Sequence, residues 1–304
     1  MTDFPRTTRA LREALAERGL APLKRHGQCF LTDVQAIDAI VRDAEVAPAD
    51  AVVEIGTGSG CLTHALCEAG ASIDTFDIDG GVQDLAKSLR EWPDRVRFHN
   101  TDALDGKHSL SAPVLEALAR GRAEATARGG LLRSVSNLPY NAATPVLLSM
   151  LALDDPPDSV TAMVQNEVAE KLLAAPGDEG YGSPSILRAL LADGKILRRF
   201  PPQVFWPTPT VRSALLRLVP RRPRAIGRGE ERPFGDFLLG LFSRRRKVLS
   251  TALRAPRPAL SAAESAAACR SAGLDPGSRP EDAAPDSLLA LFHRTESGDR
   301  RATS

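Results

Sequence analysis

The sequence predicts an α/β protein in which a domain with a parallel sheet is followed by a smaller helical domain. From residue 51 onward, short apolar runs alternate with segments of helical periodicity, which is typical of parallel strands covered by helices on both faces of a sheet. Beyond residue 233 only helical patterns remain. At 304 residues, the chain is long enough for two such domains.

Two helices are expected before the alternation begins. Leu11 and Leu15 mark the apolar face of a helix over residues 7–19. A second helix is predicted over residues 33–45, where the Asp33 side chain can accept a hydrogen bond from the first turn as an N-cap.

The alternating region is predicted to contain strands at residues 51–55, 72–76, 96–99, 131–136 and 160–165. Helices are expected between and after them at residues 61–69, 82–89, 111–128, 145–153 and 167–174. Two further strands are expected at residues 195–200 and 213–219. Proline lacks a backbone donor, so the run Pro201–Pro209 between them is predicted to hold no regular structure.

The C-terminal part is predicted to begin with a linker, residues 221–233, which is rich in proline, glycine and arginine. Helices are expected after it at residues 234–253, 261–272 and 288–292. The polar residues 296–304 are predicted to fray.

The composition favours a soluble globular protein, with 43% hydrophobic and 25% charged residues. No apolar run approaches the roughly 20 residues that a membrane helix needs. The N-terminal residues lack the apolar core of a secretory signal. We therefore expect a cytoplasmic protein with no membrane partner.

The four cysteines, Cys29, Cys61, Cys67 and Cys269, have no C-x-x-C spacing and suggest no disulfide framework. Cys61, His64 and Cys67 fall three apart and could share one helix face. A zinc ion needs four ligands, or three ligands and a water molecule, and no fourth ligand is evident. We expect these side chains to pack in the core and predict no metal site.

Positive charge is concentrated in one part of the chain. The net charge is only +1, but the segment Pro220–Arg257 contains eleven Arg or Lys residues against three acidic ones, a local excess of eight. Such a cluster can follow a phosphate backbone. A solvated, arginine-rich surface is the alternative reading.

A glycine-rich loop, Glu54–Gly60 (EIGTGSG), follows the first predicted strand of the sheet and precedes a helix. Glycines such as Gly56 and Gly58 let the backbone turn tightly and approach a ligand closely. The spacing G-x-G-x-G fits the dinucleotide fingerprint G-x-G-x-x-G poorly. Dinucleotide-binding and methyltransferase domains both use such a loop.

Acidic residues follow the next two predicted strands. Asp77, with Asp79 close behind, lies 21 residues after Gly56, and Asp102 follows the third strand. A carboxylate at the first position can accept both hydroxyl hydrogens of an adenosine ribose, and Asp102 can meet the adenine amino group. Each alone could be a turn or cap residue, but their placement at successive strand ends favours a nucleoside cofactor.

The tetrapeptide Asn137-Leu138-Pro139-Tyr140 follows the fourth predicted strand. Loops of this type mark methyltransferases that act on nucleobase amino groups. Adenine N6 is a poor nucleophile because its lone pair is delocalised into the ring. The Asn137 side-chain oxygen and the Leu138 or Pro139 backbone carbonyl can accept its two hydrogens and favour sp3 character, while Tyr140 offers a face for a flipped-out base.

Several stretches, in order along the chain, resemble the ribosomal RNA adenine dimethyltransferases, and in particular the bacterial members that act on 16S rRNA. Asn137–Pro145 is similar to the family's NLPYNISTP, and residues 24–31 are similar to its KRFGQNFL. Further resemblance is found at residues 163–169 (MxQKEV), 201–213 (PPxxFxPxPxVxS), 242–247 (FNQRRK) and 273–281 (GIDPxxRxE).

The resemblance implies a Rossmann-like class I methyltransferase domain with a small helical C-terminal domain, and S-adenosyl-L-methionine as cofactor. It implies cofactor contacts from Cys29, Leu31, Glu54, Gly56, Gly58, Asp77, Asp102 and Asn137. It implies that the target adenine is handled by Asn137, Leu138, Pro139 and Tyr140, with Phe205 closing over the base. It implies RNA binding by Arg244, Arg245, Arg246 and Lys247.

The function implied is N6-dimethylation of two adjacent adenosines near the 3′ end of 16S rRNA, in the assembling small ribosomal subunit, by a monomeric enzyme. The segments implied are an N-terminal helix with a cofactor lid (1–31), a methyltransferase domain (32–220) and a helical RNA-binding domain (234–295). Two alternatives are a 23S rRNA adenine N6-methyltransferase, which the long C-terminal match disfavours, and a non-catalytic small-subunit assembly factor, which would lack cofactor binding.

Some positions depart from the family pattern. Cys29 replaces an asparagine, Thr57 a proline, and Asp77 a glutamate that is one methylene longer. The alanine-rich segment 111–130 is longer than expected. The first three departures surround the predicted cofactor site, whereas the loop Asn137–Tyr140 is intact.

Overall fold

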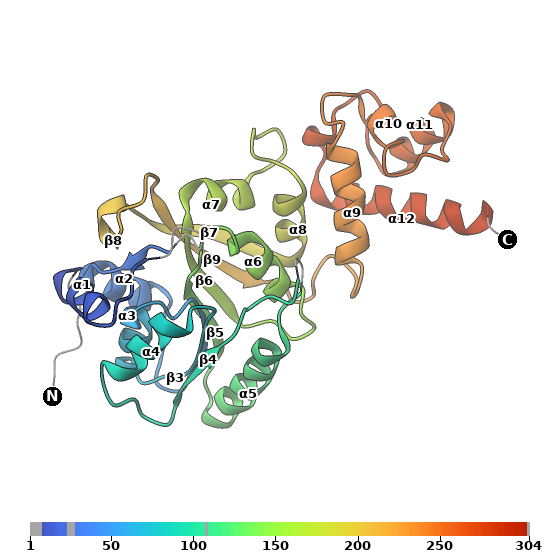
Figure 1. Ribbon diagram of the computed structural model, residues 1–304. Coiled ribbons are helices and arrows are strands. Elements are labelled where there is room, and N and C mark those ends of the chain that lie inside the picture. The colour runs from blue at the N-terminus through green and yellow to red at the C-terminus, as the bar shows by residue number, and fades with distance from the viewer. Residues whose placement is uncertain (1–7, 23–27, 107–108, 303–304) are drawn as a thin grey trace. The chain divides into compact units, whose positions relative to one another are not determined.

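The computed structural model describes residues 8–22, 28–106 and 109–302, which form two compact units (Figure 1). The first unit runs to Ala169 and also contains Gly194–Pro220. The second consists of Glu170–Asp193 and the chain from Arg221 onward. No helix in the described ranges combines the length and the apolar character needed to cross a membrane.

Within the described residues, a seven-stranded sheet is built in the order β4 (Val96–Asn100), β3 (Ser72–Asp77), β2 (Ala51–Ile55), β5 (Leu132–Asn137), β6 (Ser159–Gln165), β9 (Ser213–Pro220), β7 (Ala192–Phe200). Every predicted strand is confirmed to within a few residues. The strands β2 to β6 are parallel, as predicted. β9 runs antiparallel to β6, with Val160 opposite Leu218. Periodicity does not encode strand direction, so the sequence left this point open.

The helices that precede or connect these strands are α1 (Thr8–Glu17), α2 (Val34–Asp43), α3 (Cys61–Glu68), α4 (Gly80–Ser88), α5 (Ala112–Arg128), α6 (Ala143–Leu151) and α7 (Asn166–Leu173). All were predicted, although residue 7 of the first prediction lies outside the described residues. Asp33 caps α2 as expected, because its carboxylate accepts the Ala36 N–H at 2.7 Å.

The helices cover both faces of the sheet. Ile73 of β3 belongs to the buried apolar cluster that α2 and α3 form with the sheet. The next residue, Asp74, points to the opposite face because side chains alternate along a strand. There it accepts a hydrogen bond from Arg120 of α5. α5 therefore packs on the face opposite α2 and α3, as a doubly covered sheet requires.

The proline-rich segment after β7 differs from its prediction. Pro202–Val204 forms a 3₁₀ turn, and β8 (Phe205–Trp206) pairs antiparallel with β1 (Phe30–Leu31). The expectation of no regular structure over Pro201–Pro209 was wrong at these positions. A two-residue ladder depends on a partner far away in the sequence, so local periodicity cannot reveal it.

The second unit is helical and contains α8 (Ser183–Leu191), α9 (Glu231–Phe242), α10 (Leu249–Ala252), α11 (Ala262–Ser271) and α12 (Pro285–Ala302). Its core includes the stacked rings of Phe234 and Phe237, with Phe292 edge-on to both at 5.4 and 5.5 Å. The apolar periodicity of these helices is explained by this shared core.

Three predictions for the second unit need correction. The single helix expected over residues 234–253 is two helices, because the charged run at 244–247 forms a turn between α9 and α10. The polar residues up to Ala302, expected to fray, continue α12, while residues 303–304 lie outside the described part. α8 was not predicted, although Pro184 in its first turn is a helix-start signal.

Candidate active site

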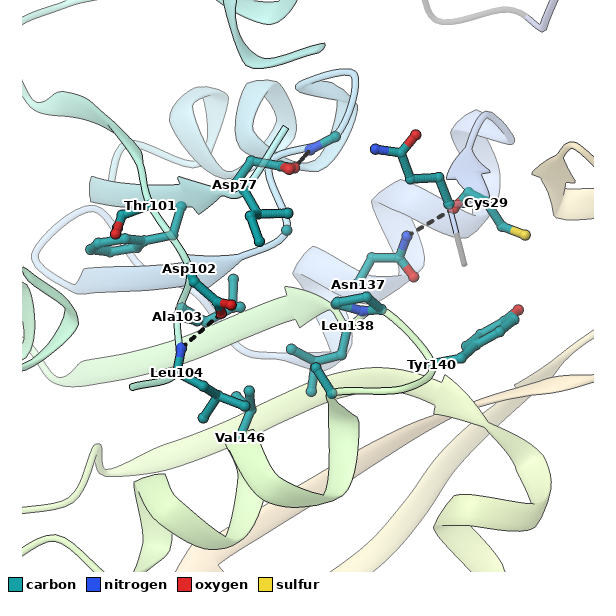
Figure 2. A pocket seen from close by; sticks show the side chains of 18 of the residues that line it. Cys29, Asp77, Thr101, Asp102, Ala103, Leu104, Asn137, Leu138, Tyr140 and Val146 are labelled. Carbon is teal, nitrogen blue, oxygen red and sulfur yellow. Dashed lines mark hydrogen bonds between the residues drawn. The ribbon is translucent and has the colours of Figure 1, made fainter. Parts of the chain in front are cut away.

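A pocket opens in the first unit at the carboxyl ends of β2, β3 and β5 (Figure 2). The chain proceeds from β2 outward to β3 and β4, and then returns to β5 and β6 on the other side of β2. Ligands of open α/β sheets bind at such a switch point. The lining residues that the sequence predicted are Cys29, Gly56, Gly58, Asp77, Asp102, Asn137, Leu138, Pro139 and Tyr140.

The glycine loop needs glycine at Gly56 for two reasons. Its φ of 91° lies in the left-handed region, which other residues rarely adopt. A Cβ atom added there would lie 2.9 Å from the backbone oxygen of Asn137. The loop backbone therefore lies directly against the end of β5, with no side chain between them.

Asp77 at the end of β3 holds the loop from the other side. One carboxylate oxygen accepts the Gly58 N–H at 2.7 Å, and the other accepts the Asp79 N–H at 2.9 Å. Each oxygen retains a further lone pair for a ligand hydroxyl. Asp79 in turn caps α4 and accepts a hydrogen bond from the Gln28 amide at 2.8 Å.

Asp102 lies on the same side of the pocket as Asp77 in Figure 2. Its carboxylate is exposed, and one oxygen accepts the Leu104 N–H at 2.9 Å. The Ser111 hydroxyl donates to the Asp102 backbone carbonyl at 2.7 Å. These two bonds fix the loop after β4, so the carboxylate is available at the rim in a defined place.

Asn137 and Tyr140 lie toward the opposite side of the pocket, near Cys29 (Figure 2). The Asn137 Nδ2 donates to the Cys29 backbone carbonyl at 3.3 Å. That bond sets the orientation of the amide and leaves its oxygen available as an acceptor. The Leu138 N–H donates to Met163 at 3.1 Å, continuing the pairing of β5 with β6.

Tyr140 is half-buried, with its hydroxyl 3.5 Å from the Ser213 hydroxyl. Burial raises the pKa of the Tyr140 phenol above its ordinary value, which the contact with Ser213 opposes only in part. The ring is therefore neutral at physiological pH. Burial likewise raises the pKa of the Cys29 thiol, so this side chain is uncharged in the pocket wall.

Three of the predicted site residues do not line the pocket. Leu31 and Phe205 are buried and lie opposite each other in the β1–β8 ladder. Glu54 is fully buried behind the glycine loop, where it accepts hydrogen bonds from the Thr63 and Thr75 hydroxyls at 2.6 Å each. Their direct contact with a ligand stays a prediction.

Other residues that line the pocket were not predicted from the sequence, among them Gln28, Phe30, Ile78, Thr101 and Leu104. A signal was available for some of them. Gln28 and Phe30 stand in the family-like stretch with Cys29, and Ile78 follows Asp77 directly. Ile78 is 56% exposed although apolar, which is notable for a residue beside a cavity.

The basic residues of the segment Pro220–Arg257 fall into two groups in the structure. Arg244, Arg245, Arg246 and Lys247 lie in the exposed turn between α9 and α10. Others serve the second unit itself: Arg221 pairs with Asp193, Arg224 pairs with Glu231, and Arg257 lies over the rings of Phe237 and Phe292. The charge count alone therefore overestimates the basic surface that is open to a ligand.

The Cys61 and Cys67 thiols are buried, and the His64 ring contacts Arg90 at 2.7 Å. Among residues 8–22, 28–106 and 109–302, no three or more His, Cys, Asp or Glu side chains group so as to hold a metal ion.

Comparisons with known proteins agree on one family. The family model described as ribosomal RNA adenine dimethylase matches residues 22–295. The chain is similar to "Ribosomal RNA small subunit methyltransferase A" of Cutibacterium acnes, at 36% identity over 90% of this chain and 88% of the relative. It is also similar to the protein of the same name from Thermobifida fusca, at 38% identity over 89% of both chains.

Two of the solved structures that resemble this one have TM-scores above 0.5. A dimethyladenosine transferase from Plasmodium falciparum aligns with a TM-score of 0.69 and 20% identity, over 89% of this chain and 98% of that one. The 23S rRNA methyltransferase ErmE aligns with a TM-score of 0.59 and 23% identity, over 88% and 99%. At these identities the likeness concerns the fold, and it confirms the predicted Rossmann-like methyltransferase fold class.

Proposed function

Since the chain belongs to the ribosomal RNA adenine dimethylase family, we propose that it transfers methyl groups from S-adenosyl-L-methionine to N6 of two adjacent adenosines near the 3′ end of 16S rRNA. Its bacterial relatives are named for the small ribosomal subunit, which supports this target. The observation that carries the chemistry is the Asn137 amide, oriented by the Cys29 carbonyl at the pocket wall.

The pocket residues fit this cofactor. Gly56 leaves no side chain between the loop and β5, so the backbone can approach a ligand closely. The two Asp77 oxygens can accept the ribose hydroxyls, and Asp102 can accept from the adenine amino group. Ile78 and Leu104 offer apolar walls to the adenine ring. When bound, the cofactor supplies an electrophilic methyl group on a sulfonium sulfur.

Asn137 and Leu138 then hold the target nitrogen. The Asn137 side-chain oxygen accepts one N6 hydrogen, and the Leu138 carbonyl accepts the other. We assign Leu138 rather than Pro139 to this role because the Pro139 carbonyl already accepts the Ala142 N–H at 3.0 Å. Two acceptors favour sp3 character at N6 and direct its lone pair into the pocket. The proton leaves to water after transfer, so no strong base is needed.

Tyr140 supports the base that has left its stack. A neutral aromatic ring in the pocket wall is a stacking surface for a flipped-out adenine. Phe205 is part of the β1–β8 ladder, and its side chain is buried. It therefore takes the role of closing over the base only if this ladder moves when RNA binds. Arg244–Lys247 are proposed to contact RNA phosphates from the second unit.

We also propose that the enzyme acts as a monomer in the cytoplasm, on small subunits that are still assembling. Light scattering of the purified protein measures the mass in solution, and a dimer mass would contradict this part of the proposal.

Methyl transfer from labelled S-adenosyl-L-methionine to undermethylated small subunits tests the function, with the rRNA products mapped by mass spectrometry. We expect dimethyladenosine at two adjacent positions near the 3′ end of 16S rRNA, and a loss of at least about a hundredfold in rate for Asn137→Ala, because that variant removes an acceptor that orients N6. Ser149→Ala, a change outside the pocket-lining residues, serves as the control.

The other outcomes are equally informative. No transfer by the wild-type chain, together with tight subunit binding, would leave a non-catalytic assembly factor. Transfer to 23S rRNA alone would reassign the target. Full activity in Asn137→Ala would remove the amide from the mechanism while keeping the reaction.

A further inference from the structure

An aromatic pair connects the wall of the pocket to the protein surface. Phe30 lines the pocket, and Trp206 lies directly opposite it in the β1–β8 ladder. Their rings are stacked, with planes 23° apart and centroids 6.4 Å apart. Phe30 is 4% exposed, whereas Trp206 is partly exposed. The stacked pair therefore leads from a ring in the pocket wall to a partly exposed ring outside the pocket.

A cation lies over the exposed member of this pair. The guanidinium carbon of Arg12, an exposed residue on α1, is 5.6 Å from the centroid of the Trp206 ring. Its neighbour Arg9 is paired with Glu13 at 2.9 Å. No ion pair joins Arg12 to an acidic side chain within the described part of the chain. An arginine on an aromatic ring suits a ligand that has both a flat base and a phosphate.

The position of the aromatic pair, Phe30 and Trp206, beside the pocket indicates which ligand would bind there. Cys29, the residue before Phe30, carries the carbonyl that orients Asn137. The pair thus adjoins the wall of the pocket at which the target base is proposed to enter. In β8, Phe205 precedes Trp206, so its side chain points to the opposite side of the ladder, where it is buried. Of the two aromatic residues of β8, Trp206 is the one that a ligand can reach.

We propose that Trp206 and Arg12 bind the RNA nucleotide adjacent to the target adenosine. Its base stacks on the Trp206 indole in place of the Arg12 guanidinium, which turns to pair with the phosphate of the same nucleotide. This inference rests on the proposed function, because it assigns a place to the substrate strand outside the pocket. Such a site holds the strand while the target base is out of the stack, and it requires no particular base identity.

Binding of a short, fluorescently labelled single-stranded RNA with two adjacent adenosines tests the proposal by anisotropy. We expect Trp206→Ala to weaken RNA binding by about tenfold, the loss typical of one base–aromatic stack, and Trp206→Phe to retain most of the affinity. Arg12→Ala should also weaken binding. It should make the negative slope of log affinity against log salt shallower by about 0.7, the value for one lost phosphate contact on a single strand.

Trp92→Ala is a matched control, because Arg90 lies over the Trp92 ring at 5.3 Å, whereas the rings that Trp92 contacts, His64 and Phe98, do not line the pocket. S-adenosyl-L-methionine affinity, measured by calorimetry, separates binding from a structural role of the ladder. Trp206→Ala should leave that affinity unchanged. Equal RNA affinity in Trp206→Ala and wild type, or a parallel loss of cofactor affinity, would overturn the proposal. A wild-type chain that binds this RNA normally but transfers no methyl group would contradict only the proposed function.

Discussion

Glu54 is the acidic residue of the glycine-loop motif, yet its carboxyl group is buried beneath the loop. One of its oxygens accepts two threonine hydroxyls, and the other, Oε1, has no hydrogen-bond partner among the described residues. Burial raises the pKa of this group from an ordinary value of 4.5 to about 8, against the opposing effect of those hydroxyls. The side chain is thus a neutral support for the loop at physiological pH.

The raised pKa predicts a pH dependence of stability. The unfolded chain releases this proton near pH 4.5, while the folded chain keeps it until about pH 8, so stability falls as pH rises between these values. The slope is at most about 1.4 kcal/mol per pH unit. Glu54→Gln, which resembles the protonated acid, should flatten this part of the curve in urea unfolding at pH 5 to 8. Parallel curves of stability against pH for the wild type and Glu54→Gln would contradict this prediction.

Gly56 allows a steric prediction with an internal control. Gly56→Ala places a Cβ atom 2.9 Å from the backbone carbonyl oxygen of Asn137, at a φ of 91°. Gly177→Ala meets the same backbone strain at φ 90° but has nothing within 4 Å. We expect Gly177→Ala to cost about 1–2 kcal/mol of folding free energy, and Gly56→Ala to cost more and to lower cofactor affinity in calorimetry. Equal costs with unchanged affinity would show that the loop has room to shift.

At the scale of elements, α5 is held to the sheet by its arginines. Arg120 donates to Asp74 of β3, which also accepts from Arg97 and His99. Arg122 pairs with Asp158. Burial alone would raise the pKa of Asp74, but the hydrogen bonds from His99, Arg97 and Arg120 outweigh it and hold the pKa at about 2. The alanine-rich helix α5 thus makes specific contacts with the sheet.

Asp74→Asn should destabilise the protein by about 3–5 kcal/mol, because it leaves Arg97 and Arg120 without their shared buried counter-charge. Asp155 also pairs with Arg122, but the Asp155 side chain is 62% exposed, so Asp155→Asn should cost less than about 1 kcal/mol. Chemical unfolding of the two variants measures the difference. Similar losses would mean that the Asp74 cluster is no better shielded from water than a surface pair.

On the scale of the whole molecule, the second unit is assembled from two separate parts of the chain. α8 lies between β6 and β7 in sequence but packs with α9 and α12. Tyr181, just before α8, donates its hydroxyl to the Ala283 carbonyl at 2.8 Å and is 4% exposed. A cut after Pro220 therefore does not follow the boundary of a folding unit.

A chain truncated after Pro220 should expose the buried residues of α8, such as Ile186 and Leu190. We expect it to bind a hydrophobic dye and to unfold at lower temperature than the full chain. A chain ending at Glu296, which keeps the buried Phe292 and Thr295, is the control and should behave like the full chain. Cooperative unfolding of the shorter chain without dye binding would contradict this account.

Local sequence signals were enough to predict the alternation of strands and helices, the glycine loop, Asp77 and the tetrapeptide from Asn137 to Tyr140. These are local signals, because periodicity and short spacings act between residues close in the chain. Parallel strands place the ends of β2, β3 and β5 at one edge of the sheet, so these motifs converge in one pocket without further information.

Which side chains reach that pocket, and which are buried or paired elsewhere, could not be predicted without the three-dimensional structure. It buries Glu54 and Phe205, leaves Trp206 partly exposed, pairs Arg221 and Arg224 with acidic residues, and joins β1 to β8. Each of these outcomes depends on contacts between residues far apart in the chain. Burial and pairing are set by such contacts, and a residue type or a local pattern carries no record of its distant neighbours.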